Sequence, residues 1–156
     1  MSSKYWSDFV QRLDPYVPGE QPSVPGLIKL NTNENPYPPS PAVLAALSTD
    51  TLEMLRLYPD PNSHALKQAV AKNCGLDEKN IFVGNGSDEV LALAFMTFFQ
   101  QSQPLLYPDI TYSFYPVYCN LYNIEAEQVP LSDDYSIELK DFERPNGGII
   151  FPNPNE

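Results

Sequence analysis

Two hydrophobic patterns alternate along most of the chain. Short apolar runs bounded by turn-forming residues predict buried strands, and they lie at 81–83, 104–108, 125–131 and 147–151. Between them, apolar side chains recur at helical spacing and predict helices at 41–47, 52–57, 64–74, 88–98, 111–122 and 137–142. This alternation is typical of an α/β fold, so we expect a mostly parallel sheet with helices on both faces.

Capping residues support two of these helices. Ser40 is followed by a proline, which is the favoured order of an N-cap serine and a first-turn proline. Ser63 stands before a later helix, and Gly75 stands where a left-handed residue would end it. His64, in the first turn of that helix, is interpreted as a solvated side chain rather than a general base, because no neighbour in sequence would activate it.

The turn between the strand at 81–83 and the following helix is the central candidate site. Gly84 and Gly86 allow a sharp turn, and Ser87 stands at the N-cap position, just before a helix with an acidic first turn. A glycine-rich turn that leads into a helix can bind an anion, because the first backbone N–H groups have no partner within the helix. The turn is neither a Walker A loop nor a complete dinucleotide fingerprint. A capped turn of an ordinary βα unit remains the alternative.

Composition excludes several classes of function. The 156 residues include 20 acidic and 9 basic side chains, and the formal charge of −11 argues against nucleic acid and anionic membrane surfaces as partners. No apolar run approaches the length of a transmembrane helix. The single histidine and the two cysteines form no cluster with metal-binding spacing, so no metal is expected. Cys74 and Cys119 form no CxxC pair, and we interpret them as reduced thiols of a cytoplasmic protein.

The first 40 residues differ from the rest of the chain. They are rich in proline and carry little periodic apolar pattern, so we predict an N-terminal arm and a polar loop at residues 1–40, followed by the α/β part at 41–156. The loop at 31–35 contains three asparagines and a glutamate. Asx turns would explain this composition, and so would a loop that presents amides to a polar substrate.

Five polar motifs occur in a definite order along the chain. They are Asn33-Glu34-Asn35-Pro36, Tyr58-Pro59, Gly84-Asn85-Gly86-Ser87-Asp88-Glu89, Pro108-Asp109-Ile110-Thr111-Tyr112 and Pro152-Asn153-Pro154-Asn155. In this order and spacing the chain resembles, over nearly its whole length, the N-terminal part of histidinol-phosphate aminotransferases, which are pyridoxal 5'-phosphate (PLP) enzymes of fold type I. The resemblance implies that residues 41–156 are an incomplete part of the PLP-binding large domain, a mostly parallel sheet flanked by helices.

The resemblance also implies a set of cofactor-binding residues. The backbone N–H groups of Ser87 and Asp88, next to Gly86, would hold the PLP phosphate, which agrees with the anion site inferred from the turn. Tyr112 would stack on the pyridine ring, although aromatic packing in the core is the alternative for this side chain. Asn155 would form a hydrogen bond with the ring hydroxyl.

Other implied roles concern the substrate and a second subunit. Tyr16 and Asn33 would contact a small amino acid or amino alcohol that carries a phosphate. Tyr58 would reach the phosphate of the neighbouring subunit's cofactor, so the intact enzyme would be a homodimer with its active sites at the interface. The implied reaction is transamination between histidinol phosphate and 2-oxoglutarate in histidine biosynthesis.

The chain departs from this family in one decisive respect. Fold type I enzymes need a lysine for the Schiff base with the cofactor, an aspartate for the pyridine nitrogen and an arginine for the substrate carboxylate. The six lysines match none of the expected positions: Lys4, Lys29, Lys67, Lys72, Lys79 and Lys140. The motif around Asn155 normally continues as Pro-Thr-Gly, where this chain has Glu156. We therefore expect a truncated chain that holds no catalytic residue and does not transaminate by itself.

Two other interpretations stay open at this point. The same motifs would serve a related fold type I enzyme, such as a decarboxylase that acts on a phosphorylated amino acid. A non-catalytic phosphate-binding α/β module would explain the glycine-rich turn without any reaction.

Overall fold

The computed structural model describes residues 4–13, 19–20, 22–47 and 49–155. It divides into two compact units, one ending at Val83 and one beginning at Gly84, with the residues up to Val17 assigned to the second. Each unit is described by itself. The boundary that the sequence suggested at residue 40 stays a prediction.

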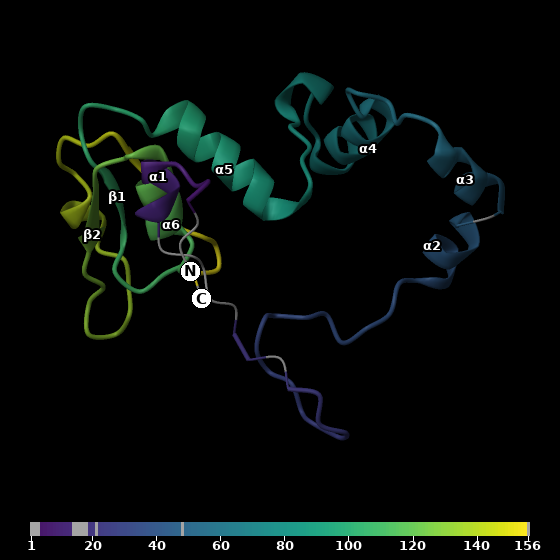
Figure 1. The fold of residues 1–156 in the computed structure, drawn as a ribbon, viewed down its shortest axis with the longest axis horizontal. Helices are drawn as coiled ribbons and strands as arrows, with labels where there is room; N and C mark the ends of the chain where they lie inside the picture. The colour runs from purple at the N-terminus through teal and green to yellow at the C-terminus, as the bar shows by residue number, and fades with distance from the viewer. Residues whose placement is uncertain (1–3, 14–18, 21, 48, 156) are drawn as a thin grey trace. The chain divides into compact units, whose positions relative to one another are not determined.

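The unit that begins at Gly84 is built on a three-stranded parallel sheet (Figure 1). Its strands are β1 (Leu105–Pro108), β2 (Ala126–Val129) and β3 (Gly148–Ile149), in the order β2-β1-β3. Leu105 lies opposite Ala126 in one neighbour and Gly148 in the other. The strands predicted at 104–108, 125–131 and 147–151 are therefore confirmed, and so is their parallel pairing.

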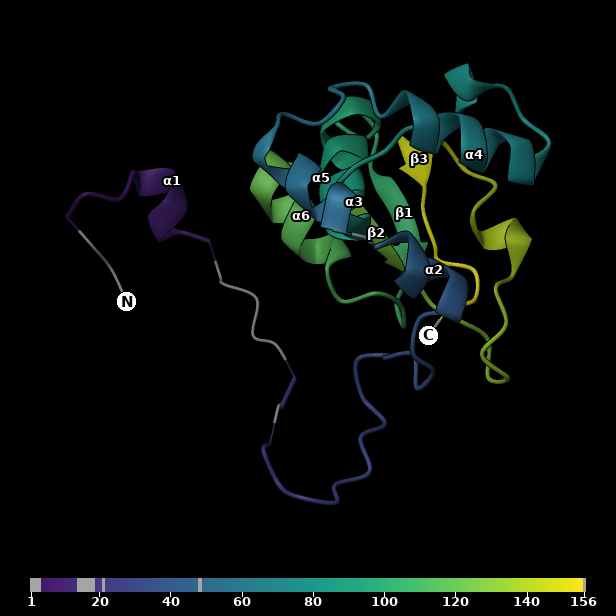
Figure 2. The same cartoon turned by 90° about the vertical axis from the view of Figure 1, so that its right-hand side faces the viewer.

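Alternate residues of β1 serve two separate cores, because successive side chains of a strand point to opposite faces. Leu105 and Tyr107 pack on the face covered by helices α5 (Gly86–Phe98) and α6 (Tyr115–Tyr122). Leu106 packs on the other face with Val129 and Phe142, beside the 3₁₀ turn η3 (Leu139–Asp141) (Figure 2). Among the described residues, η3 takes the place of the short helix predicted at 137–142.

Helix α6 begins later than the sequence pattern suggested. The apolar run predicts a helix from residue 111, whereas the structure starts it at Tyr115 with Pro116 in the first turn. A proline lacks the N–H that a helix interior requires, so the first turn is the position where it is tolerated. Residues 109–114 become a loop as a result, and this loop carries Tyr112.

The strand predicted at 81–83 is wrong in this structure. Ile81 has an extended backbone, with φ −106° and ψ 124°, yet no strand is formed at residues 81–84. An apolar run becomes a strand only where a neighbouring strand accepts its backbone hydrogen bonds. Within the part of the chain that the structure describes, no strand pairs with this segment.

The unit that ends at Val83 holds short helices. They are α2 (Pro41–Ala46), α3 (Thr49–Glu53), η1 (Met54–Arg56), α4 (His64–Cys74) and η2 (Glu78–Asn80). The Ser40 cap is confirmed, since its hydroxyl accepts a hydrogen bond from the Val43 N–H at 3.3 Å. Gly75 ends α4 in the left-handed conformation, with φ 68°, as predicted. In the arm, α1 (Asp8–Gln11) is capped by Ser7.

Two expectations about the start of α4 need correction. Ser63 precedes the helix, but its side chain makes no cap; the Asp60 carboxylate instead accepts the His64 N–H at 2.7 Å. His64 is exposed as expected, but it does have a partner, because its Nδ1 lies 2.5 Å from Glu78 Oε1. The carboxylate raises the pKa of His64, and the imidazole lowers the pKa of Glu78.

No helix among the described residues is long and apolar enough to cross a membrane. Over the same residues, no group of three or more histidine, cysteine, aspartate or glutamate side chains could hold a metal ion.

Candidate functional site

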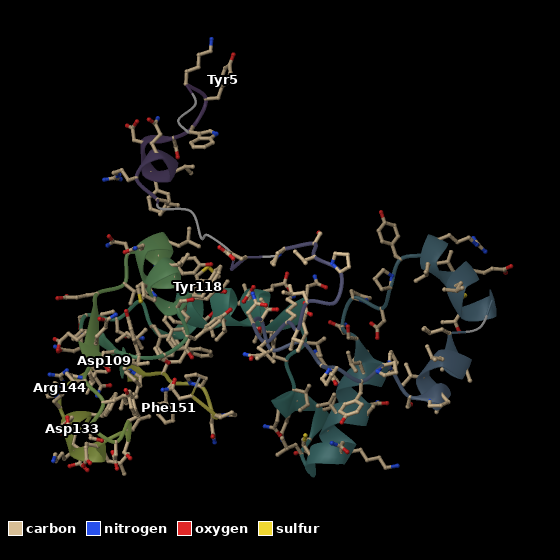
Figure 3. All side chains as sticks on the ribbon, turned by 90° about the horizontal axis from the view of Figure 1, so that it is seen from below. Tyr5, Asp109, Tyr118, Asp133, Arg144 and Phe151 are labelled. Carbon is tan, nitrogen blue, oxygen red and sulfur yellow. The ribbon has the colours of Figure 1, made fainter. Side chains whose placement is uncertain are left out.

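A cavity of about 430 Å³ lies where β1 and β3 end and α5 begins. Helix α5 contributes Ser87, Val90 and Leu91, and the loop after β1, the start of α6 and the segment after β3 contribute the other lining residues, Tyr112, Tyr115, Ile150, Phe151 and Pro152. Phe151 is labelled in Figure 3. In open α/β sheets, ligands bind beyond the carboxyl ends of the strands. This cavity is therefore the candidate ligand site.

The first turn of α5 is built differently from the sequence prediction. Gly86 is its first residue, with φ 80°, and Ser87 is the second, so the assignment of Ser87 as the N-cap is wrong. Asn85 is the N-cap, and its own N–H donates to Glu89 Oε2 at 2.6 Å. The glycine at 86 explains the difference, because its left-handed backbone lets the helix begin at residue 86, two residues earlier than a cap at Ser87 would.

This geometry keeps the anion-binding character of the helix terminus. The N–H groups of Ser87 and Asp88 belong to the first turn, where no carbonyl of the helix can accept them, and the positive end of the helix dipole is added to them. The carboxylate of Asp88 accepts a hydrogen bond from Tyr112, and that of Glu89 accepts one from the N–H of the N-cap residue Asn85. An anion at the Ser87 end of the cavity would thus meet backbone donors.

Tyr112 links the loop after β1 to this helix terminus. Its hydroxyl donates a hydrogen bond to Asp88 Oδ1 at 3.0 Å. Its ring lies 6.0 Å from Phe114 in a stacked arrangement and 5.7 Å from Tyr115 in a T-shaped one. The side chain both packs against aromatic neighbours and lines the cavity, so the two interpretations of Tyr112 are compatible.

A second tyrosine contacts the same helix terminus, and no sequence motif indicated it. Tyr118, on α6, donates its hydroxyl proton to the Asp88 carbonyl oxygen at 2.9 Å (Figure 3). Its side chain is buried with Phe95. Burial raises the pKa of the Tyr118 hydroxyl, and the nearby negative charge of Asp88 raises it further. Residues 88 and 118 are 30 apart in sequence, and only the packing of α6 on α5 brings them together.

Asn155 joins the segment after β3 to the loop after β1. Its Oδ1 accepts the Thr111 hydroxyl proton at 2.7 Å, and its Nδ2 donates to the Ile110 carbonyl at 2.9 Å. Asp109 extends this connection, because its carboxylate accepts the N–H of Leu131, after β2, at 3.0 Å. Asn155 also lines a separate cavity of about 510 Å³ with Ile110, Leu131, Tyr135, Ser136 and Ile137.

The structure brings together part of the predicted set of site residues. Ser87 and Tyr112 line the candidate cavity, Gly86 precedes Ser87, and Asp88 accepts a hydrogen bond from Tyr112. Asn155 is bonded to Thr111, the residue before Tyr112, but lines the other cavity. The other predicted residues do not belong to the described part of this unit. Tyr58 and Asn33 are exposed in the unit that ends at Val83, and Tyr16 lies outside the described residues, so the roles of all three stay predictions. The lining residues that the sequence did not indicate are Val90, Leu91, Tyr115, Ile150 and Phe151, because such side chains look like ordinary core.

Comparison with known proteins gives the class to which this fold and site belong. The family model for aminotransferase class I and II matches residues 25–156. The chain therefore belongs to the class I and II aminotransferase family.

Individual relatives carry a more specific name. The chain is 63% identical over 153 residues to histidinol-phosphate aminotransferase 1 of Hydrogenovibrio crunogenus, in a match that covers 98% of this chain and 43% of the relative. It is 61% identical over 151 residues to histidinol-phosphate aminotransferase 1 of Methylococcus capsulatus, covering 97% of this chain and 42% of that protein. These matches confirm the resemblance drawn from the five motifs. The chain spans less than half the length of these relatives.

A solved structure supports the fold. The crystal structure of histidinol-phosphate aminotransferase from Sinorhizobium meliloti in complex with pyridoxal-5'-phosphate has a TM-score of 0.68 to this chain at 24% identity. The match covers 85% of this chain and 37% of that one. The predicted fold class, the N-terminal part of a fold type I large domain, is thereby confirmed.

Proposed function

We propose that this chain supplies the cofactor-phosphate end of a PLP-dependent aminotransferase that acts on histidinol phosphate. The names of relatives that are 59–63% identical support the substrate. The single observation in the structure that carries the proposal is the cavity shared by Ser87 and Tyr112, at the start of a helix and beyond the carboxyl ends of parallel strands.

The residues around the cavity fit PLP. The N–H groups of Ser87 and Asp88 suit a phosphate, because they lack helical partners at the positive end of the dipole. The Tyr112 ring offers an aromatic surface for the pyridine, and the apolar side chains of Val90, Leu91 and Ile150 keep water from it. When bound, PLP supplies an electron sink for bonds at the carbon that carries the substrate amine.

The lysine that would anchor the cofactor and move the proton at the substrate carbon is not in this chain. Lys4 and Lys140 belong to the same unit as the cavity, and neither of them lines it. The other four lysines match none of the positions that the resemblance implies: Lys29, Lys67, Lys72 and Lys79. We infer that the lysine belongs to the part of the relatives that the match leaves uncovered, since the match covers 43% of the Hydrogenovibrio protein. The 156 residues alone would then not transaminate.

The substrate and assembly complete the proposal. Histidinol phosphate would donate the amine and 2-oxoglutarate would accept it, in histidine biosynthesis, with Tyr16 and Asn33 at the substrate. The active unit would be a homodimer in which Tyr58 reaches the partner's cofactor. Three large apolar or aromatic side chains of the unit that ends at Val83 are exposed: Ile28 at 82%, Leu30 at 89% and Tyr58 at 101%. Their exposure supports a subunit interface on that unit. The two free cysteines support a cytoplasmic location.

A chimera tests this proposal directly. This chain would replace the matched N-terminal part of the Hydrogenovibrio crunogenus relative, and the purified chimera would be assayed with PLP, histidinol phosphate and 2-oxoglutarate. We expect bound PLP, formation of glutamate and a dimer in light scattering. The 156-residue chain, assayed in parallel, should form no glutamate.

Each alternative predicts a different outcome. Release of carbon dioxide from a phosphorylated amino acid without glutamate would indicate a decarboxylase. A folded chimera that does not retain PLP would overturn the proposed function and leave a phosphate-binding module.

A further inference from the structure

Two tyrosine hydroxyls converge on one residue at the start of α5. Tyr118 donates to the backbone carbonyl of Asp88 at 2.9 Å, and Tyr112 donates to its carboxylate at 3.0 Å. We propose that Tyr118 is a positioning residue, which fixes the first turn of α5 so that the Ser87 and Asp88 amides are held ready for a phosphate. This inference rests on the proposed function and extends it to a residue outside the cavity lining.

The first turn of α5 depends on such an anchor. It begins at Gly86 in the left-handed conformation, and the side chain of Asn85 makes no capping hydrogen bond. The residues that lead into it, 81–84, are not held in a strand. The Glu89 carboxylate holds the Asn85 N–H, but the N-cap side chain does not hold the amides of the first turn. A helix end that begins with a glycine frays readily, and frayed amides would not share one direction.

Tyr118 is suited to hold this turn because its own position is fixed. The residue is 3% accessible, and its ring lies 5.1 Å from Phe95 and 5.2 Å from Phe114. Phe95 is on α5 itself, two turns after Asp88, so the ring packs on the body of the helix while the hydroxyl holds its beginning. Tyr112, by contrast, lies on a loop and lines the cavity.

The test compares two tyrosines of the same helix in the chimera described above. Tyr118→Phe removes only the hydroxyl that reaches Asp88. Tyr122→Phe is the matched control, since Tyr122 also lies on α6 and packs at the edge of the same core, but its hydroxyl makes no hydrogen bond to the described part of α5. For both variants the dissociation constants of PLP and of pyridoxal, which lacks the phosphate, are measured by spectroscopic titration.

We expect Tyr118→Phe to weaken PLP binding about three- to tenfold, the range of one lost hydrogen bond, and to leave pyridoxal binding unchanged. Hydrogen exchange of the peptide that contains residues 86–91, without ligand, should become faster in this variant only. Tyr122→Phe should change none of these values. A phosphate-specific loss is the signature that a general effect on the core would not give.

Three results would overturn the inference. The first is an equal loss of affinity for PLP and for pyridoxal in Tyr118→Phe, and the second is the same loss of PLP affinity in Tyr122→Phe. The third is a Tyr118→Phe variant that fails to fold while Tyr122→Phe folds, because the Tyr118 hydroxyl would then be needed for the core. Failure of the proposed function is a separate result, because it would be seen as absent PLP binding in the unmutated chimera.

Discussion

The Thr111 hydroxyl donates a hydrogen bond of 2.7 Å to Oδ1 of Asn155, which lies 44 residues away in sequence. The same amide donates from Nδ2 to the Ile110 carbonyl at 2.9 Å. The two contacts hold the segment after β3 against the loop after β1, at the carboxyl ends of these strands, where the candidate cavity also lies. They also set the orientation of the Asn155 amide, because the hydroxyl donor pairs with its oxygen and the carbonyl acceptor with its nitrogen.

Replacing Thr111 with valine should release this amide. Valine keeps the shape of threonine but leaves the partly buried Asn155 oxygen without its donor, so we expect a loss of about 1 kcal/mol in the free energy of unfolding. Urea denaturation of the chain measures the change, and Thr111→Ser, which keeps the hydroxyl, is the control. Unchanged stability in Thr111→Val would show that this hydrogen bond does not contribute to stability.

Tyr112→Ala should weaken retention of PLP by the chimera. Loss of an aromatic contact with the pyridine ring corresponds to about 0.5–1.5 kcal/mol in binding free energy. Tyr112→Phe keeps the ring and loses only the hydrogen bond to Asp88, so it should retain more affinity than the alanine variant. Titration of both variants with PLP measures the difference, and an unchanged affinity in Tyr112→Ala would count against the ring contact.

Gly86→Ala should destabilise the start of α5 for a conformational reason. The backbone at residue 86 has φ 80°, which L side chains rarely adopt, whereas a Cβ there would meet no atom within 4 Å. The expected cost is therefore the strain of a left-handed residue, about 1–2 kcal/mol. Gly86→Asn should cost less in the same denaturation experiment, because asparagine tolerates this conformation. Equal costs would point to a steric cause.

The His64–Glu78 pair should make the stability of its unit depend on pH. The pair raises the pKa of His64 above its ordinary 6.5 and lowers that of Glu78 below its ordinary 4.5. Its stabilisation is thus fully present between these two values. It is lost as the pH rises through the raised pKa of His64 or falls through the lowered pKa of Glu78.

His64 is the only histidine in the chain, so its NMR titration is unambiguous. Glu78→Gln should return the midpoint toward the ordinary value, while Lys79→Gln, a change on the neighbouring residue, should not lower it. A midpoint that does not move in Glu78→Gln would refute the pairing.

The two cysteines should differ in reactivity toward an alkylating reagent at pH 8. Cys74 is exposed, whereas Cys119 is buried and its burial raises the pKa of the thiol to about 11. Because the thiolate is the reactive form, only Cys74 should be modified in the folded chain, and both after denaturation in urea. Mass spectrometry of the peptides distinguishes the sites. Rapid modification of Cys119 in native buffer would contradict the packing of α6 on the sheet.

Local features of the sequence determined most of the secondary structure. The strands β1, β2 and β3 were visible as short apolar runs between turn residues, and the Ser40 and Gly75 caps were visible from residue type alone. These features depend on neighbours a few residues away, so the linear pattern contains the necessary information. The glycine-rich turn before α5 was recognised for the same reason, although the helix begins at Gly86 rather than after Ser87.

Only the tertiary structure decided which side chains meet. The segment at 81–83 did not become a strand, because a strand needs a partner that its own residues cannot supply. The contacts of His64 with Glu78, Tyr118 with Asp88 and Thr111 with Asn155 join residues 14, 30 and 44 positions apart. No local pattern specifies such pairs. The first follows from the packing of α4 beside η2, the second from the packing of α6 on α5, and the third from the position of the segments after β1 and β3.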